Sequence, residues 1–167
     1  MVLRADAQRN LDRLLEAAGE CFSEQGIDCS VDEVARRAGV GHGTVFRRFP
    51  TKEALLQAVI ARELDRFADL AEEALADPDP GLGFERFFRA VAEAYGRNRA
   101  LVEGFDHCAE LPQKIALGER AERLVRRAQK AGALRRDLRS ADVFALVPAA
   151  SRYPDVILAG LRPTPAG

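Results

Sequence analysis

The residues best suited to chemistry in this sequence are cations gathered in one short segment. From Val34 to Lys52 the chain carries five basic residues and no acidic one, although its formal net charge is -1. Acidic residues are concentrated elsewhere, for example in 69–79. A local basic patch on a nearly neutral protein can bind nucleic-acid phosphates at one face without attracting polyanions everywhere. The five cations are Arg36, Arg37, Arg47, Arg48 and Lys52.

The same segment carries the signals of a helix start and a helix stop. Ser30 and Glu33 have the spacing of a capping box, in which the serine hydroxyl accepts from the Glu33 amide while the Glu33 carboxylate reaches back. A short helix is therefore expected to begin at Val31. Gly39 suits the left-handed position that follows a helix, so this helix should end there.

A second short helix is expected directly after this turn, from His42 to Phe49, where Pro50 ends it. Ala35 is small enough to let the two helices approach closely. Two short helices joined by a tight turn cross at a steep angle and present the second one outward, where it fits the major groove of B-DNA. The apolar residues expected to form their shared core are Val34, Ala38, Val40 and Val45.

Helices are expected on both sides of this pair, and no segment shows the alternation of a strand. A first helix should end at Gly26, and Thr51 should cap a long fourth helix that continues toward Leu75. The sequence DPDPG at 77–81 is the clearest break. Beyond it we expect helices near 84–98, 100–108, 113–131, 140–151 (capped by Ser140 and interrupted by Pro148) and 154–161. The apolar stripe of the first helix consists of Leu11, Leu14, Leu15, Ala18 and Phe22.

The predicted fold class is all-α. The composition, 47% hydrophobic and 31% charged, suits a globule that buries a core. We expect an N-terminal three-helix helix-turn-helix domain at 1–52, joined by a long helix to a C-terminal helical ligand-binding and dimerisation domain at 53–162. A short disordered tail is expected at 163–167.

The run AGVGHGTVFRRFPTKEAL, residues 38–55, resembles the helix-turn-helix signature of the tetracycline-repressor (TetR) family. The preceding helix and capping box also match, so the resemblance covers about 8–56. It implies a sequence-specific, DNA-binding transcriptional regulator that binds a palindromic operator as a homodimer, usually as a repressor. The C-terminal domain would respond to a small, apolar effector. A regulator-like helical interaction protein without a small-molecule effector is the alternative.

The resemblance also implies which side chains would meet DNA. His42 and Gly43 would start the recognition helix near base edges, and the fork of Arg47 would suit guanine O6 and N7. Lys52 would add a cation to helix N-terminal amides that favour phosphate. Phe46 stands where the family commonly has tyrosine, so it loses a hydrogen bond worth about 0.5–1.5 kcal/mol. The expected DNA-binding residues are Ser30, His42, Gly43, Thr44, Phe46, Arg47, Arg48 and Lys52.

The C-terminal half is rich in aromatic residues between 67 and 105. These side chains could form a packed core or line an effector pocket. The predicted pocket residues are Phe67, Phe88, Tyr95, Phe105, His107, Cys108 and Leu111. By the same family resemblance, the last two helices would form the dimer interface, although they could equally close the core of one chain. The predicted interface residues are Val143, Leu146, Val147, Val156 and Ile157.

Other classes of function are disfavoured. An enzyme using His107 and Cys108 is not expected, because adjacent helical residues point about 100° apart and cannot form a nucleophile–base pair. Three cysteines, an odd number, argue against a disulfide framework, and Cys21 is interpreted as a small buried apolar residue. No metal or cofactor is expected. The absence of a signal peptide and of a long apolar run predicts a cytoplasmic location.

Overall fold

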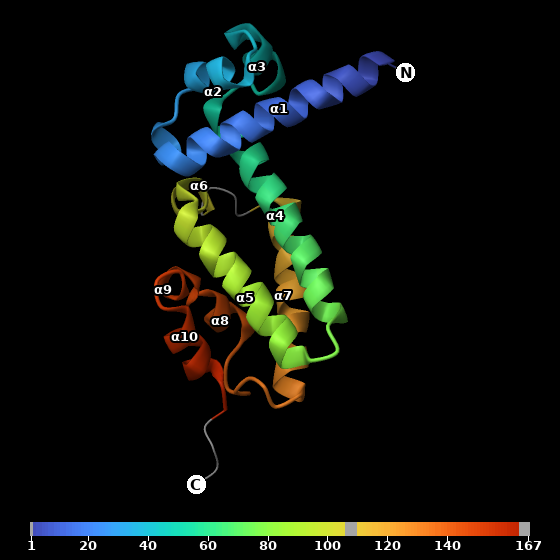
Figure 1. The fold of residues 1–167 in the computed structure, drawn as a ribbon, viewed down its shortest axis with the longest axis vertical. Helices are drawn as coiled ribbons and strands as arrows, with labels where there is room; N and C mark the ends of the chain where they lie inside the picture. The colour runs from blue at the N-terminus through green and yellow to red at the C-terminus, as the bar shows by residue number, and fades with distance from the viewer. Residues whose placement is uncertain (1, 106–109, 164–167) are drawn as a thin grey trace. The chain divides into compact units, whose positions relative to one another are not determined.

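The structure, a computed structural model, describes residues 2–105 and 110–163 and contains helices and no strand in this part of the chain (Figure 1). The predicted all-α class is confirmed. The elements are α1 (Val2–Gln25), the 3-10 helix η1 (Gly26–Asp28), α2 (Val31–Ala38), α3 (His42–Arg48), α4 (Lys52–Ala76), α5 (Pro80–Arg97), α6 (Arg99–Gly104), α7 (Pro112–Lys130), α8 (Ser140–Phe144), α9 (Val147–Ala150) and α10 (Pro154–Leu161). Among the described residues, no helix combines the length and apolarity needed to cross a membrane.

The chain divides into two compact units. The N-terminal unit contains residues 1–62 together with 98–109, and the C-terminal unit contains 63–97 together with 110–167. The compact units therefore differ from the predicted ranges 1–52 and 53–162, because the first part of α4 and the short α6 pack with the N-terminal helices. A carbon atom added to Gly104 would lie 2.7 Å from Ile60 Cδ1, which shows how closely α6 approaches α4.

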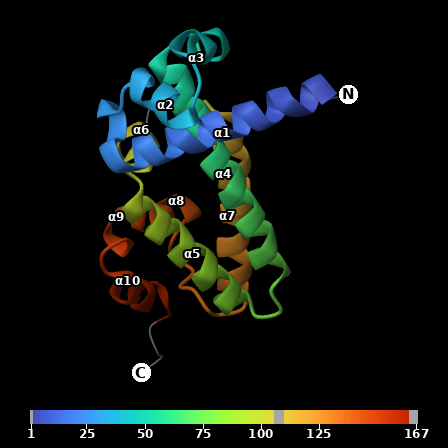
Figure 2. The ribbon, with the colours of Figure 1, turned by 45° about the horizontal axis from the view of Figure 1, so that its top comes forward.

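The N-terminal unit is built on the apolar stripe of α1. Leu14, Ala18 and Phe22 are buried, as the spacing predicts, and Figure 2 shows α2 and α3 following α1 in the same unit. Gly26 and Gly39 have φ of 63° and 68°, so both occupy the left-handed conformation expected after a helix.

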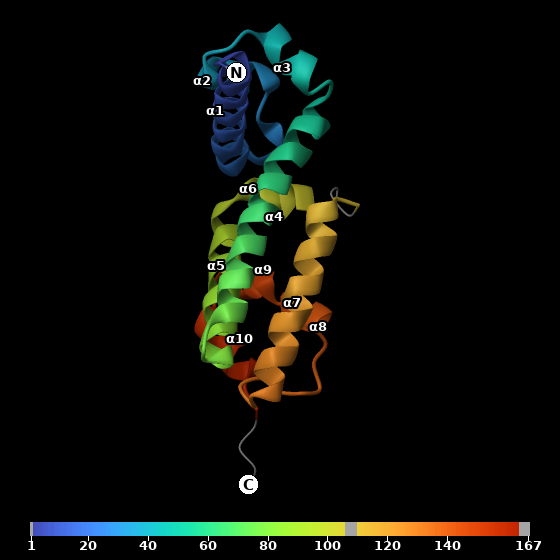
Figure 3. The same cartoon turned by 90° about the vertical axis from the view of Figure 1, so that its right-hand side faces the viewer.

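In the C-terminal unit, α5, α7 and the second part of α4 run side by side (Figure 3). The helix α5 begins at Pro80, earlier than the predicted start near 84. The carboxylate of Asp79 accepts from the amides of Gly81 at 2.8 Å and Leu82 at 3.1 Å, so Asp79 caps the start of α5. The sequence pattern at 77–81 predicted only a break between helices. Close approach of α5 to α4 depends on Gly83, since a Cβ there would lie 2.5 Å from Ala74 O.

The predicted helix at 140–151 is two helices, α8 and α9. Pro148 has no N–H to donate to the carbonyl of Phe144, which interrupts the hydrogen-bond ladder between them. The predicted Ser140 cap is wrong: Ser140 is the first helical residue. Arg139 is the cap, and its amide donates to the Asp142 carboxylate at 3.1 Å.

Stacked and tilted aromatic rings pack together in the C-terminal unit. Phe84 and Phe88 have ring centroids 5.6 Å apart, and Phe144 lies 6.1 Å from Phe88. Val143 and Val147 are buried in the same cluster. These two predicted interface residues therefore hold one chain together and offer little surface to a second.

Cys21 and Cys29 form a disulfide bond between α1 and the residue that precedes the α2 cap. The expectation of no disulfide is therefore wrong, whereas the burial of Cys21 is confirmed, since both cysteines are 0% exposed. The turn of η1 brings their Cα atoms to 5.8 Å, within the range that a disulfide spans. An odd number of cysteines does not prevent two of them from pairing.

Reduction of this bond should destabilise the N-terminal unit. The cross-link joins residues eight apart, and the loop-closure entropy of so short a loop corresponds to about 2–3 kcal/mol. Dithiothreitol should lower the thermal midpoint by roughly 5–10 °C in calorimetry. The double variant Cys21→Ala/Cys29→Ala serves as the control, since its midpoint should not respond to the reductant. An unchanged wild-type midpoint after verified reduction would contradict the expectation.

Candidate nucleic-acid interface

The helices α2 and α3 are joined by a turn whose backbone bonds close it tightly. The amide of Val40 donates to Ala35 O at 3.0 Å, and Thr44 N donates to Gly41 O at 2.8 Å at the start of α3. Ser30 caps α2 as predicted, its hydroxyl accepting from Glu33 N at 3.2 Å. The helix α3 is only seven residues long, and its bounds agree with the predicted helix within one residue.

One side chain anchors α3 in the N-terminal unit. Val45 is 0% exposed, and Val34, Ala35 and Ala38 of α2 are buried with it. Phe46 is 36% exposed. The remaining predicted DNA-contacting residues of α3 are all exposed: His42, Gly43, Thr44, Arg47 and Arg48. The structure thus turns the predicted recognition surface outward.

His42 at the start of α3 contacts two neighbours. Its Nδ1 pairs with the Asp32 carboxylate of α2, and its ring centroid lies 4.5 Å from that of Phe46. Phe46 therefore keeps a stacking role although it lacks a hydroxyl. Asp32 was missed by the sequence interpretation, because a contact between consecutive helices leaves no periodic signal. These contacts hold the imidazole against the surface of α3.

The Arg47 side chain lies along α3. Its Nε donates to Gly43 O at 3.2 Å, and its Nη2 donates to Thr44 Oγ1 at 3.3 Å. Each contact is long and exposed and has an uncharged acceptor, so it restrains the guanidinium only weakly. The acceptor atoms of a base edge, or a charged phosphate, could replace either contact at little cost.

Lys52 lies at the start of α4, beside the cap formed by Thr51, whose hydroxyl accepts from Ala54 N at 3.1 Å. The Lys52 ammonium donates to Ile27 O of η1. Within the described residues, no carboxylate pairs with Arg47, Arg48 or Lys52. Three of the five cations in the basic run therefore keep their charge available to an anion.

Arg36 and Arg37 differ from these three, because carboxylates neutralise them. The Glu33 carboxylate pairs with Arg36 Nη2 and with Arg37 Nε, both at 2.7 Å, and Arg37 also pairs with Glu24 of α1 at 2.9 Å. The predicted return of Glu33 to the Ser30 amide is wrong, since the arginines occupy its carboxylate. Hydrogen bonds from Arg36 and Arg37 lower the pKa of Glu33 to about 2.

The predicted effector-pocket residues are not gathered in one described cavity. Phe67 and Phe88 are buried, while Tyr95 and Leu111 are half-buried. Phe105, also half-buried, belongs to the N-terminal unit. His107 and Cys108 lie outside the described residues. Placement of these side chains therefore does not outline a common site.

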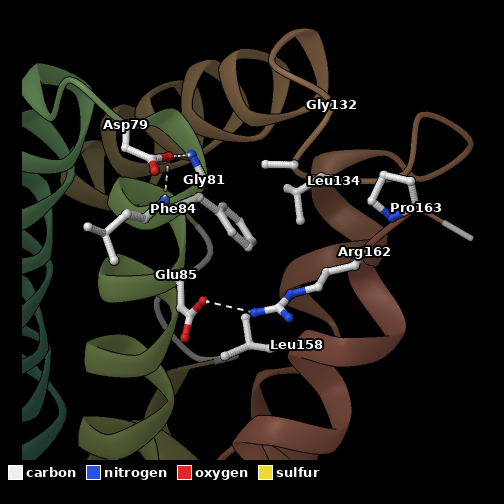
Figure 4. Close-up of a pocket in the computed structure, with 11 residues that line it drawn as sticks. Asp79, Gly81, Phe84, Glu85, Gly132, Leu134, Leu158, Arg162 and Pro163 are labelled. Carbon is white, nitrogen blue, oxygen red and sulfur yellow. Dashed lines mark hydrogen bonds and ion pairs between the residues drawn. The ribbon is translucent and has the colours of Figure 1, made fainter. Parts of the chain in front are cut away.

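A cavity of about 610 Å³ lies elsewhere in the C-terminal unit, between the start of α5, the segment after α7 and the end of α10 (Figure 4). Phe84, Leu134 and Leu158 supply apolar walls, and the Arg162–Glu85 ion pair at 3.5 Å lies at its edge. Its lining includes no predicted pocket residue. Within residues 2–105 and 110–163 no cluster of three potential metal ligands occurs.

The predicted dimer-interface residues divide by burial. Val143 and Val147 are buried within one chain, as described above, and Leu146 and Ile157 are half-buried. Val156 on α10 is 70% exposed, and Tyr153 beside it is 63% exposed. Two neighbouring apolar side chains are therefore left exposed at the start of α10.

The outward second helix of a tightly turned pair defines a helix-turn-helix protein, and comparison with known proteins identifies its family. Residues 14–59 match the family model described as bacterial regulatory proteins, tetR family. Residues 79–163 match the model described as SbtR-like transcriptional regulator, C-terminal domain. The chain belongs to the TetR family of transcriptional regulators.

Solved structures agree with this assignment over nearly the whole chain. A TetR transcription regulatory protein from Mycobacterium vanbaalenii is 39% identical, with a TM-score of 0.72 over 96% of this chain and 99% of that chain. The TetR regulator SCO0520 from Streptomyces coelicolor is 30% identical, with a TM-score of 0.65 over 92% and 98% of the two chains.

Curated relatives match over a shorter region. The HTH-type transcriptional regulators SrpR and TtgW of Pseudomonas putida are each 37% identical over 91 residues, or 54% of this chain. The match spans 39% of the length of SrpR and 63% of the length of TtgW.

The ion pairs of Glu33 with Arg36 and Arg37, here called the Glu33 cluster, predict how the stability of the folded protein changes in acid. Because the pKa of Glu33 is lowered to about 2 from an ordinary 4.5, its contribution is fully present above about pH 4.5 and is lost as pH falls through about 2. Glu33→Gln should be less stable at pH 7, and its stability should rise less steeply with pH between about 2 and 4.5. Urea unfolding at a series of pH values measures both effects. Glu20→Gln, which changes an exposed glutamate of α1, is the matched control; identical pH profiles for Glu33→Gln and wild type would refute the role of this cluster.

Proposed function

We propose that this chain is a repressor that binds a palindromic operator through α3 and the start of α4. The observation that carries this proposal is the set of three cations without a carboxylate partner among the described residues, Arg47, Arg48 and Lys52. Arg47 and Arg48 are exposed on α3, whose only buried side chain is Val45, and Lys52 is half-buried at the start of α4. His42, Gly43 and Arg47 would meet base edges, while Ser30, Thr44, Arg48 and Lys52 would contact phosphates. Phe46 would support His42 by stacking. Such a regulator acts where chromosomal DNA lies, in the cytoplasm.

A homodimer would place two recognition helices in successive major grooves. Half-sites one helical turn apart then require two chains related by a two-fold axis. The exposed side chains of Val156 on α10 and of Tyr153, which precedes this helix, support a contact there, with half-buried Leu146 and Ile157 contributing at its edge. Isologous packing of α10 on its copy would bury Val156 against apolar side chains.

A small, apolar effector would regulate the repressor by binding the C-terminal unit. Differential affinity for two conformations of the dimer would shift the population away from the form that binds operator. The cavity of about 610 Å³ has a volume suited to a small molecule. Its mixed lining of Phe84, Leu158 and Arg162 would accept an apolar body with a polar end.

Replacement of two cations should have different effects on DNA binding. Arg47→Ala should relax sequence preference, because it removes about 1–3 kcal/mol of discrimination at one base. Lys52→Ala should weaken binding to all duplexes alike and reduce the salt slope by about one per chain. Gel shifts with the DNA upstream of the gene and with an unrelated duplex measure both. Arg136→Ala, at an exposed arginine of the C-terminal unit, is the control; negligible effects from both Arg47→Ala and Lys52→Ala would reject this placement of the interface.

A charge on α10 should prevent dimerisation without unfolding the chain. Val156→Asp places a carboxylate on a side chain that is 70% exposed in one chain, so it costs little in the monomer but would be buried and unpaired in the dimer. Analytical ultracentrifugation should show a monomer. Val102→Asp, at a half-exposed valine of the N-terminal unit, should leave the dimer intact. A Val156→Asp protein that remains dimeric would exclude α10 from the interface.

A further inference from the structure

The backbone of Ile27, between α1 and α2, is held from both sides by charged side chains. On one side the Glu103 carboxylate of α6 accepts from Ile27 N at 2.8 Å. On the other, Ile27 O accepts from the ammonium of Lys52 at the start of α4. A residue of η1 thereby connects an acid of α6 to one of the cations of the DNA-binding surface.

Glu103 is itself fixed in place. Its second carboxylate oxygen accepts from Arg99 at 2.8 Å and 3.1 Å. These two partners, the Ile27 amide first and then Arg99, lower the pKa of Glu103, so the carboxylate is charged at neutral pH. Close packing of Gly104 against Ile60 and Leu56 holds α6 itself against α4. The Glu103 carboxylate is therefore held by contacts within the N-terminal unit.

The backbone before Ile27 accommodates this carboxylate. Gly26 has φ of 63°, and a Cβ built on it would lie 2.1 Å from Glu103 Oε2. Any other residue at this position would push the carboxylate away from the Ile27 amide. Gly26 thus has two roles: it ends α1, as its spacing predicts, and it leaves room for the Glu103 carboxylate.

We propose that Glu103 is a positioning residue for DNA binding, which acts through the Ile27 backbone to hold the Lys52 ammonium at the start of α4. This inference rests on the proposed function, in which Lys52 contacts a phosphate. An ammonium has three N–H donors, so Lys52 can keep its bond to Ile27 O while it donates to a phosphate. Holding a flexible lysine in its bound position removes the entropic cost of ordering it on DNA.

The physical consequence is a loss of affinity without a loss of folding when Glu103 is removed. Ile27 is 46% exposed, so water can reach its amide in Glu103→Ala. We expect operator affinity to fall about three- to ten-fold per bound chain, the amount that corresponds to ordering one long side chain. The salt slope should fall by about one per chain, as in Lys52→Ala. A purely structural role for Glu103 would not change the salt slope.

A double-mutant cycle tests this inference with a duplex that the wild-type protein enriches from a random-sequence pool. If Glu103 acts through Lys52, Lys52→Ala/Glu103→Ala should bind no more weakly than Lys52→Ala alone. Glu103→Gln keeps an acceptor for the Ile27 amide and should largely restore binding. Glu20→Ala, which removes an exposed carboxylate of α1, controls for charge and should lower neither affinity nor salt slope.

Several results would overturn the inference. Additive losses in the double variant, or a wild-type salt slope in Glu103→Ala, would show that Glu103 does not act on Lys52. If Lys52→Ala weakens binding and Glu103→Ala does not, the inference alone fails; if Lys52→Ala has no effect, the proposed phosphate contact fails with it. Should Glu103→Ala not fold, Gly26→Ala provides the second route. It should lower the salt slope in the wild-type background and leave it unchanged in the Lys52→Ala background, and any other result rejects the mechanism.

Discussion

A left-handed glycine and one buried valine fix the crossing of α2 and α3. Gly39 reverses the chain at φ of 68°, and Val45 is buried, as are Val34, Ala35 and Ala38 of α2. A helix of seven residues has room for only one such anchor, so its other side chains face solvent. This constraint places Arg47 and Arg48 outward without any dedicated interaction to hold them there.

Charge neutralisation separates the cations of one basic run into two groups. Arg36 and Arg37 both bind Glu33 within α2, and Arg37 also binds Glu24, which joins α2 to α1. Arg47, Arg48 and Lys52 have no carboxylate partner among the residues that the structure describes. Surface ion pairs add little stability on their own. The main effect of pairing some cations and not others is therefore to decide which part of the surface keeps a positive potential. It remains on α3 and at the start of α4.

Residues 26–30, which connect α1 to α2, are held by three contacts with other parts of the N-terminal unit. The disulfide holds Cys29, the Glu103 carboxylate holds the Ile27 amide, and Lys52 holds the Ile27 carbonyl. A short connection fixed at each of these points sets the position of Ser30, the α2 cap. The chain thus uses both covalent and charged contacts to orient the start of the helix pair relative to α1.

Local signals in the sequence were sufficient for the helix-turn-helix pair. The Ser30 cap, the glycine stops at Gly26 and Gly39, and the recognition helix from His42 were predicted because each depends on residues a few positions apart. The same holds for the class of fold and for the family, whose signature lies in one continuous segment.

Contacts between distant segments were decided only by the tertiary structure. Neither the Cys21–Cys29 bond nor the contact of Glu103 with Ile27 follows from spacing, because each depends on how η1 and α6 pack. The burial of Val143 likewise depends on neighbouring helices. Helix propensity and periodicity describe one helix at a time, whereas these features arise from contacts between the side chains of different helices.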